Sequence, residues 1–135
     1  GLAGVIENSR DTLEPVRKTA IKVAMSYPEH FVQAMDLHFR LPENTAHLRG
    51  LFRSAGLAPA DIWHGESLFK FGSGREVLNW VLHTGASAGF DRVMSRRSKA
   101  MCDSAFERII EEDFKHNGVI TVAHNFVAGI ARKEN

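Results

Sequence analysis

The residues from Val119 to Ala131, VITVAHNFVAGIA, are the most informative segment for predicting the fold. It is almost continuously apolar and starts with β-branched residues, which is typical of a strand buried on both faces of a sheet. Such a strand needs neighbours, because a two-stranded ribbon is only marginally stable by itself. We therefore expect helices of this chain, a second copy of the chain or strands from a missing segment to flank it, and the sequence suggests a half-domain.

One other long strand is predicted, from Ile62 to Phe71, after a break at Pro59. Because side chains alternate between the faces of a strand, its residues divide into two sets. One face carries Trp63, Gly65, Ser67, Phe69 and Phe71, and the other carries Ile62, His64, Glu66, Leu68 and Lys70.

Helical patterns fill most of the remaining sequence. Apolar residues recur at spacings of three and four from about Thr12 to Met25. Ser26 and Glu29 read as a capping box that opens a second helix, so residues 1–40 are expected to form a helical hairpin. A third helix, around Leu48 to Ala55, should end at a left-handed Gly56.

Two more helices are predicted between the strands. Ser73 and Glu76 form a second capping box, and the helix that follows is expected to end in Gly85–Gly89, a segment of small residues. A longer helix, from about Lys99 to His116, buries one apolar stripe and is stopped by Asn117-Gly118. Its outer face pairs opposite charges at i,i+4 as Lys99–Asp103, Arg108–Glu112 and Glu111–Lys115.

Composition excludes several classes of protein. With 135 residues and 44% hydrophobic content, the chain suits one domain, divided into 1–40, 43–72, 73–117 and 118–133. Its 17 basic and 16 acidic residues give a net charge of +1, so neither a nucleic acid nor a membrane is an expected partner. The single Cys102 favours a reducing, cytoplasmic setting, and no run approaches the ~18 apolar residues of a membrane span. The fold class is α/β, or α+β for an isolated piece, mainly helical with two long antiparallel strands.

The order of these segments resembles the latter part of class I S-adenosylmethionine-dependent methyltransferases. In that family an amphipathic helix ending in Ala-Gly-apolar, as in Leu48–Leu57, leads into the sixth strand, here Ile62–Phe71, and a helix like Ser73–Trp80 follows. The closing residues 118–133 resemble the seventh strand, which runs antiparallel in an otherwise parallel sheet. The resemblance covers residues 44–133 and makes residues 74–117 a helical insert over the substrate.

The resemblance stops short of the cofactor site. Family members hold S-adenosylmethionine with a Gly-x-Gly-x-Gly-like turn and with an acidic residue after the second strand, and this chain has neither. Its nearest match, Gly72-Ser73-Gly74, follows the wrong strand. The resemblance thus implies the substrate-recognition half of a methyltransferase for a small organic acceptor, with the cofactor-binding half absent and no activity expected from this chain alone.

Two alternatives stay open beside this interpretation. One is a non-catalytic module that binds a ligand, or pairs with its own copy as a homodimer through Val119–Ala131. The other is a small enzyme of another family that uses its histidines in a closed pocket.

The candidate site residues come from the two strands and the insert. His124 and His64 are the candidate general bases, and His124 ranks first because it interrupts an apolar strand, where its burial would require a partner. The expected substrate-binding wall consists of Trp63, Phe69, Trp80, His83 and Phe90. For each of these residues, a place in the core or on the surface is the competing interpretation.

No metal or nucleophile site is predicted. No two histidines are spaced i,i+3 or i,i+4 within a helix, so metal binding is not expected. Cys102 lies on an inward stripe and reads as a small core residue. The only basic cluster could meet an anionic group of a substrate, although a solvated linker explains it as well; it consists of Arg92, Arg96, Arg97 and Lys99.

Overall fold

A computed structural model describes residues 1–30, 42–84 and 96–133, and these residues have an α/β fold. The chain divides into two compact units. The first unit comprises residues 1–13, 39–68 and 123–135, and the second comprises residues 14–38 and 69–122. The elements, in chain order, are β1 (Leu2–Asn8), α1 (Glu14–Ser26), η1 (Pro28–His30), α2 (Thr45–Ser54), β2 (Leu57–Phe71), α3 (Gly74–Leu82), α4 (Arg96–Phe114), β3 (Lys115–His116) and β4 (Val119–Lys133).

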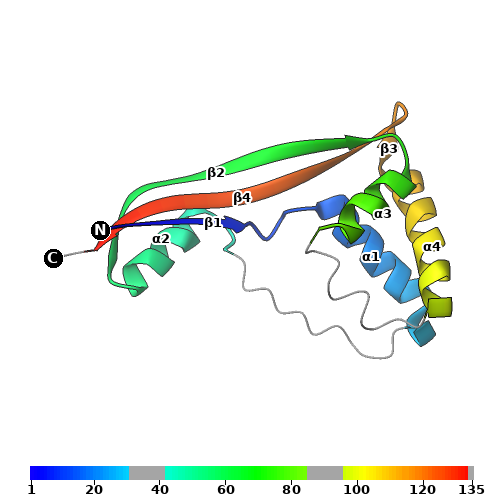
Figure 1. Cartoon of the computed structure of the whole chain (residues 1–135), viewed down its shortest axis with the longest axis horizontal. Helices are drawn as coiled ribbons and strands as arrows, with labels where there is room; N and C mark the ends of the chain where they lie inside the picture. The colour runs from blue at the N-terminus through cyan, green and yellow to red at the C-terminus, as the bar shows by residue number, and fades with distance from the viewer. Residues whose placement is uncertain (31–41, 85–95, 134–135) are drawn as a thin grey trace. The chain divides into compact units, whose positions relative to one another are not determined.

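The strands form an antiparallel sheet in the order β1-β4-β2, and β3 also pairs with β4 (Figure 1). The two long strands that the sequence predicts are confirmed as β2 and β4, each of 15 residues. In the first unit β1 pairs with β4 from Leu2↔Arg132 to Asn8↔Phe126. The chain's own β1 and β2 therefore flank β4.

The prediction of a helical hairpin over residues 1–40 is wrong at its start, because Leu2–Asn8 forms β1. The first helix is confirmed as α1, but Ser26 is its last residue and is followed by η1. The segment Leu2–Ile6 carries apolar residues on both faces, so it lacks the alternation that would reveal a half-buried strand. Pairing with β4, more than 100 residues away in the sequence, determines its conformation.

Strand β2 begins earlier than predicted, at Leu57, and continues through Pro59. Proline lacks the N–H that an interior strand needs, but β2 lies at an edge of the sheet, where one side of the backbone makes no ladder bonds. Just before β2, Gly56 has φ +71°, which confirms the predicted left-handed end of α2.

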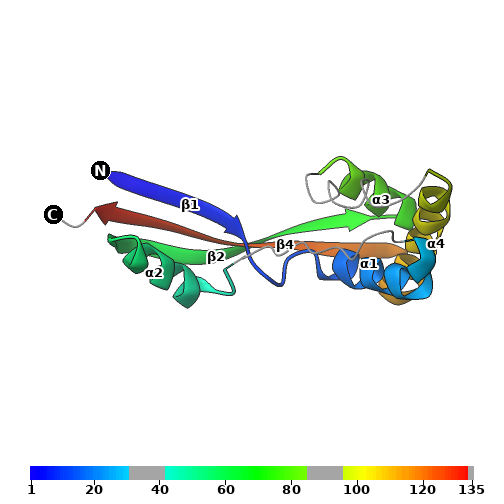
Figure 2. The same cartoon turned by 90° about the horizontal axis from the view of Figure 1, so that it is seen from below.

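The core of the first unit forms between α2 and one face of the sheet (Figure 2). Leu48 and Phe52 of α2 are buried against Val127 and Ala131 of β4. Between these two β4 residues lies Gly129, where a Cβ would come within 2.6 Å of the Phe52 ring. The absence of a side chain there allows α2 to approach the sheet closely.

The second unit is built from α1, α3 and α4 and the neighbouring strand segments. The buried stripe of α4 carries Cys102, Phe106, Ile109 and Ile110, and Lys22 of α1 pairs with Asp113 of α4. On the outer side of α4 the three predicted i,i+4 ion pairs are all present, with N···O distances of 3.1, 3.2 and 3.7 Å. Local periodicity and charge therefore predicted this helix well.

The capping box of α3 is confirmed, with one difference. Ser73 Oγ accepts a hydrogen bond from Glu76 N at 3.2 Å, whereas the Glu76 carboxylate accepts from Gly72 N at 2.7 Å and not from Ser73 N. Gly74 then brings α3 against α4, since its N–H donates to Glu111 Oε1 at 2.7 Å. After α4, Asn117 and Gly118 take φ values of 49° and 77° and turn β3 into β4.

Several predicted features lie outside the described residues: the helix with Phe31, Met35, His38 and Phe39, and the run Gly85–Gly89. Within the part of the chain that is described, no helix is both long and apolar enough to cross a membrane.

Candidate functional site

A pocket of about 220 Å³ lies in the first unit, beside the carboxyl end of β1. The pocket is lined by residues that follow β1, by the segment that begins α2, and by β2 and β4: Ser9, Asp11, Glu43, Asn44, Thr45, His64, Gly65, Asn125, Phe126 and Val127.

The segment after β1 is held against β4 by a series of hydrogen bonds. Ser9 N donates to Asn125 O at 3.0 Å, and Asn125 N donates to the Thr12 hydroxyl at 2.9 Å. Leu13 N donates to Ala123 O at 2.9 Å, and this bond helps to hold Leu13 at φ 53°, a conformation that non-glycine residues rarely adopt. The backbone that carries Asp11 is thus fixed from both sides.

The opposite wall is the amino-terminal turn of α2. Asn44 is the N-cap, and its side-chain oxygen accepts from His47 N at 2.9 Å. Arg10 ties this wall to the segment after β1, because its N–H donates to Pro42 O at 3.3 Å and its guanidinium pairs with Glu43. The side chains of that pair are more than half and about half exposed, at 62% and 50%, so the ion pair itself contributes little.

The two candidate histidines lie on opposite faces of the sheet. A Cβ on Gly65 would meet the Phe126 ring, so odd-numbered residues of β2 share a face with even-numbered residues of β4. A Cβ built on Gly129 would lie 3.2 Å from Ile62 Cγ1 and would also meet Phe52 of α2, so Ile62 and Gly129 share the face that α2 covers. His64 therefore shares the α2 face and the pocket, whereas His124 lies on the other face and is not among the pocket residues.

The structure gives His124 the partner that its place in the strand requires. Its Nε2 lies 2.6 Å from Asn8 Oδ1, and its ring centroid lies 6.4 Å from that of Phe126. An imidazole N–H that donates to this amide oxygen is satisfied by a protein group. In this position His124 fixes the end of β1 to β4, and its catalytic role stays a prediction.

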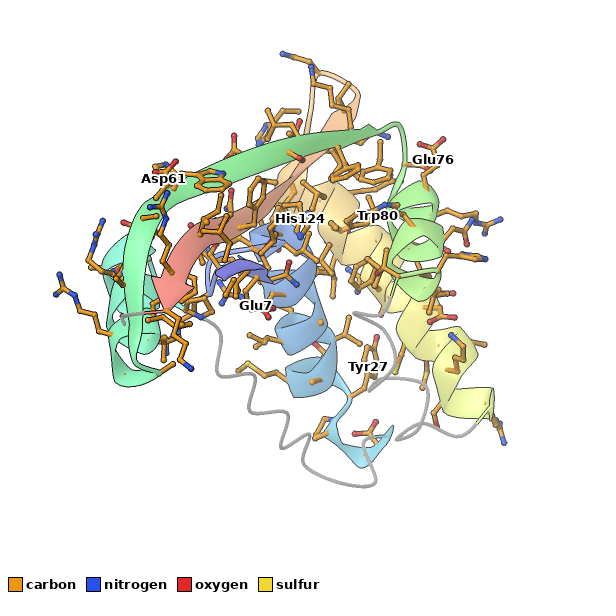
Figure 3. All side chains as sticks on the ribbon, turned by 60° about the vertical axis from the view of Figure 1, so that its left-hand side comes forward. Glu7, Tyr27, Asp61, Glu76, Trp80 and His124 are labelled. Carbon is orange, nitrogen blue, oxygen red and sulfur yellow. The ribbon has the colours of Figure 1, made fainter. Side chains whose placement is uncertain are left out.

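The predicted substrate-binding wall does not gather at the pocket. Trp63 is 40% exposed and lies on the face opposite His64. Phe69 and Trp80 belong to the second unit, where their ring centroids lie 4.9 Å apart; Figure 3 shows Trp80 on α3 and His124 on β4. His83 is the C-cap of α3, with Nδ1 2.6 Å from Asn79 O, and Phe90 lies outside the described residues.

The remaining candidates give no second site. Burial raises the pKa of the Cys102 thiol, and the negative charges of Asp103 and Glu29 raise it further, so the thiol stays protonated. Among residues 1–30, 42–84 and 96–133, no three His, Cys, Asp or Glu residues are grouped as metal ligands. Of the basic cluster, Lys99 pairs with Asp103, while Arg92 lies outside the described residues.

Sequence reasoning missed the two carboxylates of the pocket, Asp11 and Glu43. Both lie outside helices and strands, and only the pairing of β1 with β4 and the packing of α2 bring them to one place. A signal was present for Asp11, because a polar run from Asn8 to Asp11 directly follows an apolar segment. Recognising that segment as a strand would have placed these side chains at its carboxyl end.

A scan of the sequence against models of protein families found no match. A search of curated proteins found no relative either.

Proposed function

We propose that this chain is the substrate-recognition half of an S-adenosylmethionine-dependent methyltransferase that acts on a small organic acceptor. The observation that carries the proposal is the direction of β4, which runs antiparallel between β1 and β2. Its two neighbours consequently point the same way. The resemblance to class I methyltransferases implies such an antiparallel last strand in an otherwise parallel sheet.

The order of elements before β4 supports the same interpretation. Helix α2 is followed by the left-handed Gly56 and leads directly into β2. Helix α3 comes next, with Ser73 as its N-cap. This is the succession of helix, strand and helix on which the resemblance depends. Helices α3 and α4 stand where the resemblance implies a helical insert.

The exposed edge of β1 that faces away from β4 supports the proposal that a cofactor-binding half normally lies beside it. Leu2, Val5 and Ile6 are 70, 39 and 75% exposed, and no strand among the described residues pairs with the edge of β1 that faces away from β4. A strand with apolar residues on both faces is typical of the interior of a sheet. Further strands of a cofactor-binding half would pair with this edge, and helices packed on the two faces of the sheet would cover these residues.

The pocket fits the acceptor side of this function. It lies at the carboxyl end of β1, and its volume of about 220 Å³ limits it to a small molecule. His64 is the only one of the two candidate bases that lines it, and it would accept a proton from a bound hydroxyl or amine. A reducing, cytoplasmic setting suits the lone, buried Cys102.

The alternative of a self-associating module is favoured by the same exposed strand. In the described residues β4 lies between β1 and β2, and β1 pairs with Phe126–Arg132, so the outer edge of β1 offers a more accessible route than Val119–Ala131. A second copy would pair with β1 instead.

Calorimetric titration with S-adenosylhomocysteine separates these proposals. We compare the chain with a longer protein that extends on the amino-terminal side of Gly1, and measure the mass of both by sedimentation. The proposal predicts binding by the longer protein only, and a monomeric mass. Micromolar binding by the chain alone would contradict the missing cofactor site, whereas a dimer of a longer protein that binds no cofactor would favour the self-associating module.

A further inference from the structure

We propose that the pocket beside the carboxyl end of β1 binds a small organic cation, a protonated amine on a short apolar chain. This inference goes beyond the proposed function and does not require it, since such binding is measured without any methyl transfer. It depends on the charge, the hydrogen-bonding groups and the size of the pocket in the first unit.

The charge of the pocket is negative. Asp11 and Glu43 both line it, and none of the ten lining residues is a lysine or an arginine. Arg10 offsets the charge of Glu43 from outside the lining. The Asp11 carboxylate instead accepts from a neutral group, the Ser9 hydroxyl, so its negative charge stays available to a ligand.

The Asp11 carboxylate is also held in place. Ser9, its hydrogen-bond partner, is only 5% exposed, and Asn125 Nδ2 donates to the backbone oxygen of Asp11 at 3.4 Å. The bonds from Ser9, Asn125 and Leu13 fix the backbone on either side of it. A charged group that is already ordered loses little conformational entropy when a ligand binds.

The rest of the lining suits an amine with a short carbon chain. Among the described residues, the imidazole of His64 and the hydroxyl of Thr45 have no hydrogen-bond partner, and either can accept a hydrogen bond from an ammonium group. Val127, which lies on the same face of the sheet as His64, provides an apolar side chain beside these polar groups. The volume of about 220 Å³ equals that of roughly seven waters, which suits a ligand of a few heavy atoms.

An anion is disfavoured at the same place. The amino terminus of α2 would attract an anion, but Asn44 already caps it by accepting from His47 N. Glu43 is the residue before this cap, and both Glu43 and Asp11 line the pocket. Two carboxylates repel an anionic group, so the charge of the pocket selects for a cation.

The test uses butylamine as the probe and the backbone amide spectrum of the ¹⁵N-labelled chain as the readout. Butyrate and 1-butanol, which have the same carbon chain, serve as anionic and neutral comparisons at the same pH. We expect butylamine to shift the amides of residues 9–11, 43–45, 64–65 and 125–127, and the other two compounds to shift them only at much higher concentration.

Charge-neutral variants locate the binding. Asp11→Asn should weaken butylamine binding roughly tenfold, because a hydrogen bond to a charged group is lost. Asp61→Asn removes an exposed carboxylate of β2 that does not line the pocket, and should change the affinity by less than about twofold. Glu43→Gln provides a second test if Asp11→Asn does not fold. The inference is overturned if butylamine shifts none of these amides, if butyrate binds as tightly, or if the folded pocket variants bind like the native chain.

Discussion

Gly74 offers the sharpest test of the packing in the second unit. A Cβ at this position would lie 2.3 Å from the backbone oxygen of Glu107 and 2.9 Å from its Cα. These are backbone atoms of α4, so they can move only if the two helices separate. Such a separation would also stretch the 2.7 Å hydrogen bond from Gly74 N to the Glu111 carboxylate.

We therefore expect Gly74→Ala to lower the free energy of unfolding. Overpacking costs ~1–3 kcal/mol, and a clash with backbone belongs at the upper end of that range. Alanine favours a helix interior by at most ~1 kcal/mol over glycine, and Gly74 lies in the first turn of α3, where this gain is smaller. The expected net loss is about 2 kcal/mol.

Gly50→Ala is the matched control. Gly50 lies inside α2, and a Cβ there would meet nothing within 4 Å, so alanine should raise the free energy of unfolding by up to ~1 kcal/mol. Urea unfolding followed by circular dichroism measures both variants. If Gly74→Ala unfolds at the same urea concentration as the native chain, the close approach of α3 and α4 is refuted.

Three further predictions concern single side chains. Because burial and nearby carboxylates raise the pKa of Cys102, its thiol should react with iodoacetamide at pH 8 far more slowly than the thiol of glutathione does. The free energy of unfolding should fall as the pH rises above 9.0, because the thiol ionises there in the unfolded chain before it does in the folded one. Urea titrations of Cys102→Ala should lack that part of the pH dependence. Asn44→Ala removes the cap bond to His47 N and should cost ~1 kcal/mol of unfolding free energy, with faster amide exchange in the first turn of α2. Gly65→Ala should cost ~1–3 kcal/mol, because its Cβ would lie 2.2 Å from the Phe126 ring, and a double-mutant cycle with Phe126→Ala should recover most of that loss.

Helix ends and helix faces could be predicted from the sequence because their causes are local. The cap at Ser73, the left-handed Gly56 and the ion pairs along α4 each involve residues within four positions of one another. The long strands β2 and β4 were also predicted, since their apolar runs are long enough to stand out.

Strand β1 could not be predicted in the same way. Leu2–Asn8 is short and lacks alternation, and it becomes a strand because β4 pairs with it across more than 100 residues. Because β1 was not predicted, the pocket could not be predicted either, since the end of that strand positions Ser9 and Asp11. The extension of β2 through Pro59 depends likewise on the sheet, because only an edge strand tolerates proline there.

The candidate site was predicted in part for the same reason. Alternation correctly separated His64 from Trp63 on β2, but no local pattern relates the faces of β2 to those of β4. That relation follows from the register of the sheet, which places His64 beside Asp11 and Glu43 and places His124 beside Asn8.

A methyl-transfer assay tests the proposed methyltransferase function. S-adenosylmethionine with an isotopically labelled methyl group is incubated with a panel of small acceptors that includes amines, and labelled products are measured for the chain alone and for the protein extended before Gly1. We expect methyl transfer by the extended protein, loss of transfer in the His64→Ala variant of that protein, and no transfer by the chain alone. Transfer by the chain alone, or none by an extended protein that binds the cofactor, would contradict the proposed function.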